Sequence, residues 1–428
     1  MLGGIFPTIG DGAHHAGPAV VLAFLISGVV CACVAFCYAE FSSMVPVAGS
    51  AYTYAYATLG EIVAWIIGWD LILEYGVSAA PVASSWSSYM QGLLATVGVH
   101  LPDWAVTANL NGWHSQVDLL AALIVVAISV LLSIGIKESS RVNVAFVVVQ
   151  VVTMIVFLVA VAPHMHASNF VPFSPMGWQG IGASTALVFF AYIGFDTVTV
   201  ASEEAHRPER DVPIGILLSL AIGTVLYIAL TFVTVGALSW TKLSAGAAML
   251  DAVHAATHNA TLEWIVGIGG VAGNTTVMLT SLLGQARIFY VMARDRMLPP
   301  AVARVHSRFR TPMRMTLITG GIVAVLAAIV PLDFLLKLVN IGTLSAFTIV
   351  CVGVLLLRIY RPDAKRPYKA PLGIFFPALG ALSCLTTMIY LGGPTWIRFI
   401  VWFVVGVVFY AMYGYWHSRL RTGVAPTN

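Results

Sequence analysis

The sequence contains very little charge. Asp, Glu, Lys and Arg make up 9% of its 428 residues, whereas hydrophobic residues make up 59%, and the mean hydropathy is +0.91. A soluble protein of this length needs far more charge to cover its surface. The composition therefore excludes an ordinary globular protein and predicts one that crosses a bilayer many times.

Cysteine is also scarce, and it gives no sign of a disulfide framework. The five cysteines all stand in apolar segments: Cys31, Cys33, Cys37, Cys351 and Cys384. The first three have no cluster of His or carboxylates beside them, so we interpret all five as small apolar side chains. His164-x-His166 alone is a poor metal site. We expect no metal and no other cofactor.

Signs of catalysis and of nucleic-acid binding are lacking as well. No nucleophile–base pair converges on an apolar segment, so the sequence does not favour an enzyme. The basic loop from Arg294 to Arg314 follows from membrane topology, because Lys and Arg collect in cytoplasmic loops. We expect no nucleic-acid partner.

Long apolar segments are what the sequence does have. A membrane helix needs about 20 apolar residues, and eleven apolar segments approach or exceed this length. We therefore predict an all-α polytopic membrane protein with complete spans near residues 18–44, 60–98, 117–136, 142–162, 180–201, 212–238, 262–293, 315–330, 340–357, 372–391 and 397–416.

The basic residues predict the orientation of these spans. Seventeen of the 21 Lys and Arg residues lie in alternate loops or in the tail. The positive-inside rule places these loops and the C-terminus in the cytoplasm. A polar loop is expected from about Gly10, on the outer side. Residues 1–10 would then be the outer end of a helix, and we expect the first half of this helix to be missing.

The order of the spans predicts an inverted repeat. Residues 1–162 (the helix 1 remnant and helices 2–5) would correspond to residues 163–357 (helices 6–10), with 358–428 forming accessory helices 11–12 and a cytoplasmic tail. The first member of each set contains a glycine break, at Gly3-Gly4-Ile5 and at Ile193-Gly194-Phe195. Paired breaks of this kind mark the central site of secondary transporters.

Four acidic residues stand in or beside spans. Asp196 follows the second break, where an ionisable residue indicates function unless it only caps the next half-helix. Asp70 and Glu74 lie four apart on one helix face; they relay protons, contact a solute or form a buried structural pair. Glu40, near a span end, is interpreted as a structural contact to the basic cytoplasmic face.

Several motifs together give the chain a family resemblance. It resembles the amino acid–polyamine–organocation (APC) superfamily, in particular the cationic amino acid transporter branch and its bacterial relatives. This implies a LeuT-like fold of 5+5 inverted helices and transport of amino acids by alternating access, with protons or by exchange. The matching motifs are Tyr38–Phe41, Pro46–Tyr54, Gly68–Tyr75, Phe189–Asp196, Glu203-Glu204, Pro208–Ile214, Gly284–Asp295 and Asn340–Thr343.

The resemblance also implies the parts of a substrate site. The family's glycine-rich turn binds the substrate carboxylate, and backbone carbonyls of the second break bind its ammonium. An aromatic residue covers the substrate, and two further positions face its side chain. Leu2 departs from this pattern, because the family has its first glycine there. The implied residues are Gly3, Gly4 and Ile5 for the carboxylate, Ala191, Tyr192 and Gly194 for the ammonium, and Phe190, Ile193 and Met278 for the gate and side-chain pocket.

Coupling and specificity are less determined. Gln150 stands where bacterial relatives tend to have a Lys, and an amide does not titrate, so protons would have to use another carrier such as Asp196 or Glu74. Met278 favours neutral or broad specificity. The alternatives are a cationic amino acid or polyamine transporter, and a transport-inactive truncated homologue or sensor. The expected partners are an amino acid, the bilayer of the cytoplasmic membrane and protons; the oligomeric state is left open.

Overall fold

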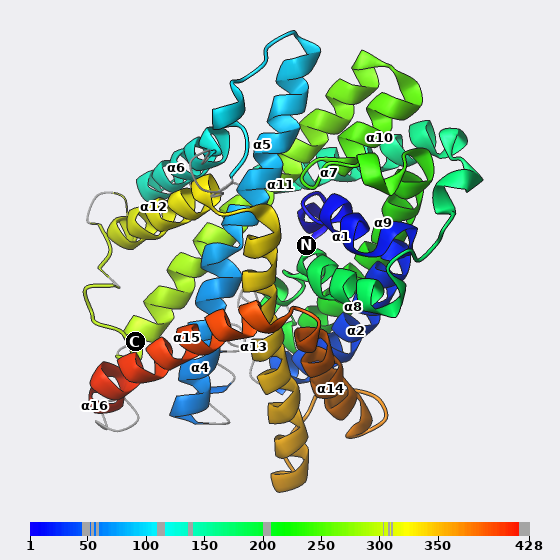
Figure 1. Cartoon of the computed structure of the whole chain (residues 1–428). Coiled ribbons are helices and arrows are strands. Elements are labelled where there is room, and N and C mark those ends of the chain that lie inside the picture. The colour runs from blue at the N-terminus through cyan, green and yellow to red at the C-terminus, as the bar shows by residue number, and fades with distance from the viewer. Residues whose placement is uncertain are drawn as a thin grey trace.

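The computed structural model describes residues 1–44, 52, 55–56, 60–108, 116–135, 140–199, 207–302, 304–306, 309 and 311–418. All regular elements in these ranges are helices (Figure 1). Most of the Pro46–Tyr54 motif, and Glu203 and Glu204, lie outside the described residues.

The helices confirm a polytopic all-α membrane protein. In the described ranges, eight helical segments are long and apolar enough to cross a membrane, and three shorter apolar helices join them. Each of the eleven predicted spans corresponds to one of these. They are α2 (Val20–Met44), α4 (Glu61–Leu71) continuing through the π-helical turn η3 (Ile72–Val77) into α5 (Ala79–Thr96), α6 (Leu119–Ile134), α7 (Ser140–Val161), α8 (Gly177–Val188), α9 (Pro208–Ala237), α11 (Ala260–Arg294), α12 (Met313–Ile329), α13 (Leu332–Tyr360), α14 (Phe375–Ile389) and α15 (Gly393–Phe409).

Two helices lie where loops were expected. The prediction of a polar loop from Gly10 is wrong, because residues 9–16 form α1 (Ile9–Ala16), and most of it is buried. Its glycines serve close packing: a Cβ at Gly10 would lie 1.9 Å from the Ser244 carbonyl oxygen, and one at Gly12 would lie 2.5 Å from a methyl of Val188. The second is α10 (Ala248–Thr257), which packs against α7, α9 and α11.

Helix pairs follow the order that the predicted repeat would give. α1 packs against α8, α2 against α9, α5 against α11 and α6 against α12. Figure 1 shows α6 beside α12, and α5 crossing α11 at the centre. In the last three pairs the second helix is the predicted counterpart of the first, whereas α1 lies where a loop was expected. A two-fold arrangement brings such counterparts together, although the repeat itself stays a prediction.

The last two spans pack against the body of this chain. α14 lies against α2 and α13, and α15 lies against α4 and α13. The indole nitrogens of Trp65 and Trp69 on α4 donate to the carbonyls of Gly406 and Trp402 on α15, each at 2.9 Å. A side chain at Gly406 would meet the Trp69 ring at 2.5 Å. These contacts fix α15 on α4.

The structure confirms the structural interpretation of Glu40. This buried carboxylate on α2 forms an ion pair with Arg358 at the end of α13, and its second cation, Arg366, lies 3.2 Å away. The backbone N–H of Ala370 also donates to it at 2.9 Å. Glu40 therefore fastens α2 to the segment that follows α13.

Glu40→Gln is expected to lower the stability of the protein. Removing one member of a buried ion pair leaves the other charge uncompensated, which costs roughly 3–5 kcal/mol. The measurement is thermal unfolding of the purified protein in detergent. Glu209→Gln, at an exposed position in the first turn of α9, is the matched control. Equal melting temperatures for the two variants would contradict a stabilising role of Glu40.

Candidate functional site

The predicted break in the second half of the chain is present. α8 continues into the 3-10 turn η8 (Phe189–Tyr192), after which Ile193 takes an extended conformation with ψ 136°. Gly194 follows with φ +106°, a backbone conformation that costs little only for glycine. The helix therefore ends at Tyr192, inside a span and four residues before Asp196.

The other predicted break lies directly against it. The turn η1 (Leu2–Ile5) contacts η8. A Cβ at Gly4 would lie 2.9 Å from the Cα of Ala191, so the two backbones touch with no room for a side chain. Gly3 lies equally close to α11, where a Cβ would be 2.7 Å from the Gly273 carbonyl oxygen. Sequence reasoning placed these two breaks together, and the structure brings them into contact.

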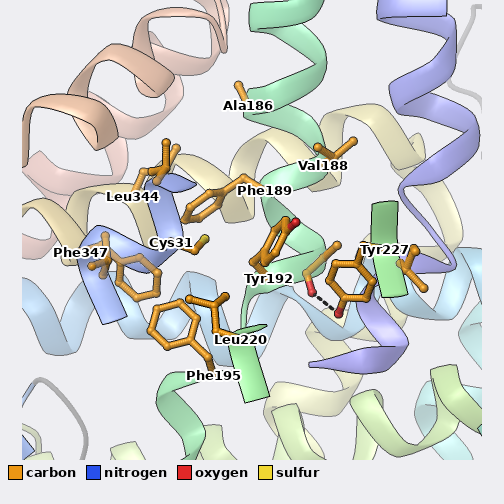
Figure 2. Packing of buried hydrophobic residues seen from close by; sticks show 14 of the residues in the cluster. Cys31, Ala186, Val188, Phe189, Tyr192, Phe195, Leu220, Tyr227, Leu344 and Phe347 are labelled. Carbon is orange, nitrogen blue, oxygen red and sulfur yellow. Dashed lines mark hydrogen bonds between the residues drawn. The ribbon is translucent and has the colours of Figure 1, made fainter. Parts of the chain in front are cut away.

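Two tyrosines support the meeting point. The Tyr227 hydroxyl of α9 lies 2.9 Å from the Ala191 carbonyl oxygen and 2.8 Å from that of Met1. The Tyr192 hydroxyl donates to the Phe24 carbonyl of α2 at 2.7 Å. Their rings meet edge to face, with centroids 5.1 Å apart. Figure 2 shows both rings in the cluster that also holds Phe189 and Phe195. Tyr227 was missed, because one Tyr within an apolar span carries no signal.

Backbone carbonyls are the polar groups at the second break. The Ala191 carbonyl accepts from Tyr227, and the Gly194 carbonyl accepts from the Thr197 hydroxyl at 2.6 Å. A carbonyl oxygen has two lone pairs, so that of Ala191 keeps one for a further donor, whereas that of Gly194 also accepts from the Thr197 N–H at 3.3 Å. Asn340 of α13 donates to two carbonyls of the last turn of α8, at 2.7 and 2.9 Å. The motif Asn340–Thr343 was noted from the sequence, but the bonds from Asn340 to the end of α8 were not predicted.

Apolar side chains form one wall beside the break. Phe190 and Met278 are buried in the same cluster with Leu187 and Leu279, and the partly buried Ile193 packs against it. The three residues predicted for the gate and the side-chain pocket are thus brought together, from η8, the break itself and α11.

Three acidic side chains are buried near the same break. Asp196 accepts from the Tyr75 hydroxyl at 2.9 Å and faces Glu74, which lies on the π-helical turn η3. Asp70 lies one turn earlier on α4, close to Ser345. All three are almost inaccessible to water. Asp70 and Glu74, which the sequence placed on one helix face, thus belong to a buried group of acidic side chains that also includes Asp196.

Gln150 lies on the other side of η1. It is buried on α7, and its amide nitrogen is 2.9 Å from the position that a Cβ on Gly273 would take. That same position is 2.7 Å from the Phe6 ring. Within the described residues the amide nitrogen has no acceptor. Gln150 therefore lies close to Gly273 and to Phe6, the residue that follows the glycine-rich turn.

Comparison with known proteins gives the family. Residues 1–410 match the family model described as amino acid permease. The chain is 43% identical to the branched-chain amino acid permease BcaP of Bacillus subtilis, over 98% of this chain and 90% of that protein. It is 41% identical to the methylthioribose transporter of the same species, over 98% and 91%. It is 37% identical to the vacuolar cationic amino acid transporter 4 of Arabidopsis thaliana, over 84% and 62%.

The match over nearly the whole chain agrees with the apolar helices and with the two facing breaks. The protein is a multi-pass membrane transporter that belongs to the amino acid permease family.

Proposed function

We propose that this permease carries uncharged amino acids with apolar side chains by alternating access. The observation that carries the proposal is the meeting of two helix breaks beside an apolar wall. Backbone N–H groups of the first break (Gly3, Gly4, Ile5) would bind the carboxylate, and carbonyls of the second (Ala191, Tyr192, Gly194) the ammonium, because helix ends offer groups of these two kinds. The Gly4 N–H donates to the Met1 carbonyl at 2.9 Å and would have to leave it first. Phe190, Ile193 and Met278 would face the side chain.

The contact between the breaks explains why the protein would have to change shape. Gly4 and Ala191 touch through their backbones, so a solute fits between them only after they separate. We infer that η1 and η8 move apart to admit a substrate and come together again after its release. The repeats 1–162 and 163–357 would supply this motion, with 358–428 as an accessory part.

The relatives leave two substrate classes to be compared. BcaP is named for branched-chain amino acids, which fit an apolar wall of Phe190, Ile193 and Met278. Methylthioribose is the second candidate, because its named transporter is 41% identical over the same share of the chain. It has an apolar methylthio group but neither a carboxylate nor an ammonium. Cationic substrates are less favoured, because Asp196 already faces Tyr75 and Glu74.

The proposal is tested by uptake into proteoliposomes. Radiolabelled leucine is expected to enter, and isoleucine, valine and methionine are expected to compete with it more strongly than methylthioribose, lysine or putrescine. Gly4→Ala is expected to abolish uptake, because its Cβ would meet Ala191, whereas Gly321→Ala has open space and serves as the control. Preferential uptake of methylthioribose or lysine would reject this substrate class, and no uptake of any solute would favour the inactive homologue.

Met278→Ser is expected to broaden the substrate range. The substitution replaces a buried thioether chain in the apolar wall with a small polar side chain, so bulkier side chains such as that of phenylalanine should compete better. We expect leucine affinity to fall at the same time, since apolar contact is lost. Competition profiles measured on wild type and variant check this. Identical profiles would remove Met278 from the pocket.

We further propose that Glu74 and Asp196 carry the coupling proton, and that Gln150 does not. Two carboxyl groups in contact inside a protein cannot both be charged at low cost, so the pair is a place where a proton is held. Asp70 lies one turn away and would extend the path.

Asp196→Asn and Glu74→Gln are each expected to abolish the stimulation of leucine uptake by an inward proton gradient. Leucine exchange across the membrane should persist, because exchange needs no net proton movement, and this separates coupling from folding. Asp103→Asn, at an exposed position, is the control. Full stimulation in both pair variants would show that the proton uses other groups.

The distribution of Lys and Arg supports the orientation inferred above. We propose that the protein resides in the cell membrane with its C-terminus in the cytoplasm.

A further inference from the structure

A second cluster of polar groups lies apart from the helix breaks, where α1 meets the start of α13. It consists of Asp11 and His15 of α1 and Asp333 of α13. One potential ligand atom from each of the three lies within 4.8 Å of the other two. The sequence could not reveal this cluster, because Asp333 is more than 300 residues from the other two.

The buried member of the cluster has an unpaired oxygen. Asp11 is only 6% exposed, and within the described part of the chain its Oδ2 has no hydrogen-bond donor. Its other oxygen, Oδ1, lies 4.0 Å from the ring of His15. A buried carboxylate oxygen without a partner is costly. A cation bound between the helices would remove this cost.

The orientation of His15 also suits a bound ion. Its Nδ1 lies 2.9 Å from the backbone carbonyl oxygen of Asp11, which can only accept, so Nδ1 carries the proton. The second nitrogen, Nε2, then has a lone pair and faces Oδ1 of Asp333 at 3.8 Å. A backbone carbonyl that orients the ring in this way is the usual support of a metal-binding histidine.

The charges around the cluster are unbalanced. Lys337, one turn further along α13, lies 2.8 Å from the Asp333 carboxylate and is the nearest cation. His14 is also near Asp11, but its Nε2 is bonded to the Leu243 carbonyl at 2.8 Å. Two carboxylates and an imidazole lone pair thus face one ammonium group. The side chains of His15 and Asp333 are 30% and 41% exposed, so an ion from solution can reach them.

We propose that Asp11, His15 and Asp333 form a binding site for a divalent transition-metal ion of the zinc class. Zinc takes imidazole nitrogen and carboxylate oxygen at about 2.0–2.2 Å, and a tetrahedral arrangement places such ligands about 3.4 Å apart. The separations, which reach up to 4.8 Å, would have to contract to this value, and rotation of the side chains is the movement that brings the ligand atoms together. Water would complete the coordination. Nitrogen together with oxygen ligands favours zinc over calcium or magnesium.

An ion at this site would join α1, which follows the first break, to α13, whose Asn340 holds the last turn of α8. On the proposed function, in which the breaks separate, zinc outside the vesicle would slow uptake. Binding itself does not depend on transport and is therefore measured first.

The test titrates purified protein, freed of any histidine tag, with Zn²⁺ in a calorimeter, and follows thermal unfolding with and without the ion. We expect one site in the wild type. His15→Gln and Asp333→Asn should each weaken it by at least about tenfold, since even outer-shell partners cost that much. His14→Gln is the control and should bind as the wild type does. Lys337→Gln should bind more tightly, because the competing ammonium is gone.

Melting temperatures without zinc show whether each variant is folded. Tighter binding by Lys337→Gln together with weaker binding by the two ligand variants supports the site, since a general disturbance would weaken all of them. Undiminished binding by both ligand variants overturns it. The proposal is also overturned if the wild type binds no zinc but becomes more stable to heat at lower pH, because the cluster then binds a proton and no metal ion. Normal binding without any effect on uptake would count against the proposed motion and not against the site.

Discussion

Every backbone polar group inside a bilayer must find a partner within the protein, and this requirement governs the structure around Tyr192. A helix that ends in mid-membrane releases N–H and C=O groups that lipid cannot satisfy. Here the released groups are covered by a second broken segment, by the Tyr227 hydroxyl and by the Asn340 amide. Glycine at positions 3 and 4 is what lets the two segments approach so closely. The break is therefore maintained by packing from α9, α11 and α13.

The same constraint explains why the sequence was informative about the fold. Each membrane crossing needs about 20 apolar residues, so the eleven spans could be located from hydropathy, and Gly194 marked the break. α1 was missed because its glycines, which serve close packing, read as a loop. α10 was missed because a short apolar helix outside the spans has no comparable length rule.

The candidate site was accessible from sequence only in part. Asp196 and Glu74 stood out because carboxylates are rare in spans, and the roles proposed for Gly3, Phe190 and Met278 came from the family resemblance. Tyr227, Asn340 and the cluster of Asp11 with Asp333 depend on side chains from distant helices meeting in space. A single sequence gives no signal for such contacts, because each residue is unremarkable among its own neighbours.

The two C-terminal helices, α14 and α15, hold α13 in place. α13 is flanked by α14 and by α15, which is itself locked to α4 through Trp65 and Trp69. On the proposed motion, α13 would be the part of the protein against which α1 and α8 move. Asn340 and Asp333 both lie on α13; Asn340 bonds to the end of α8, and Asp333 faces α1. A movement of α8 or of α1 would therefore change contacts with the same helix.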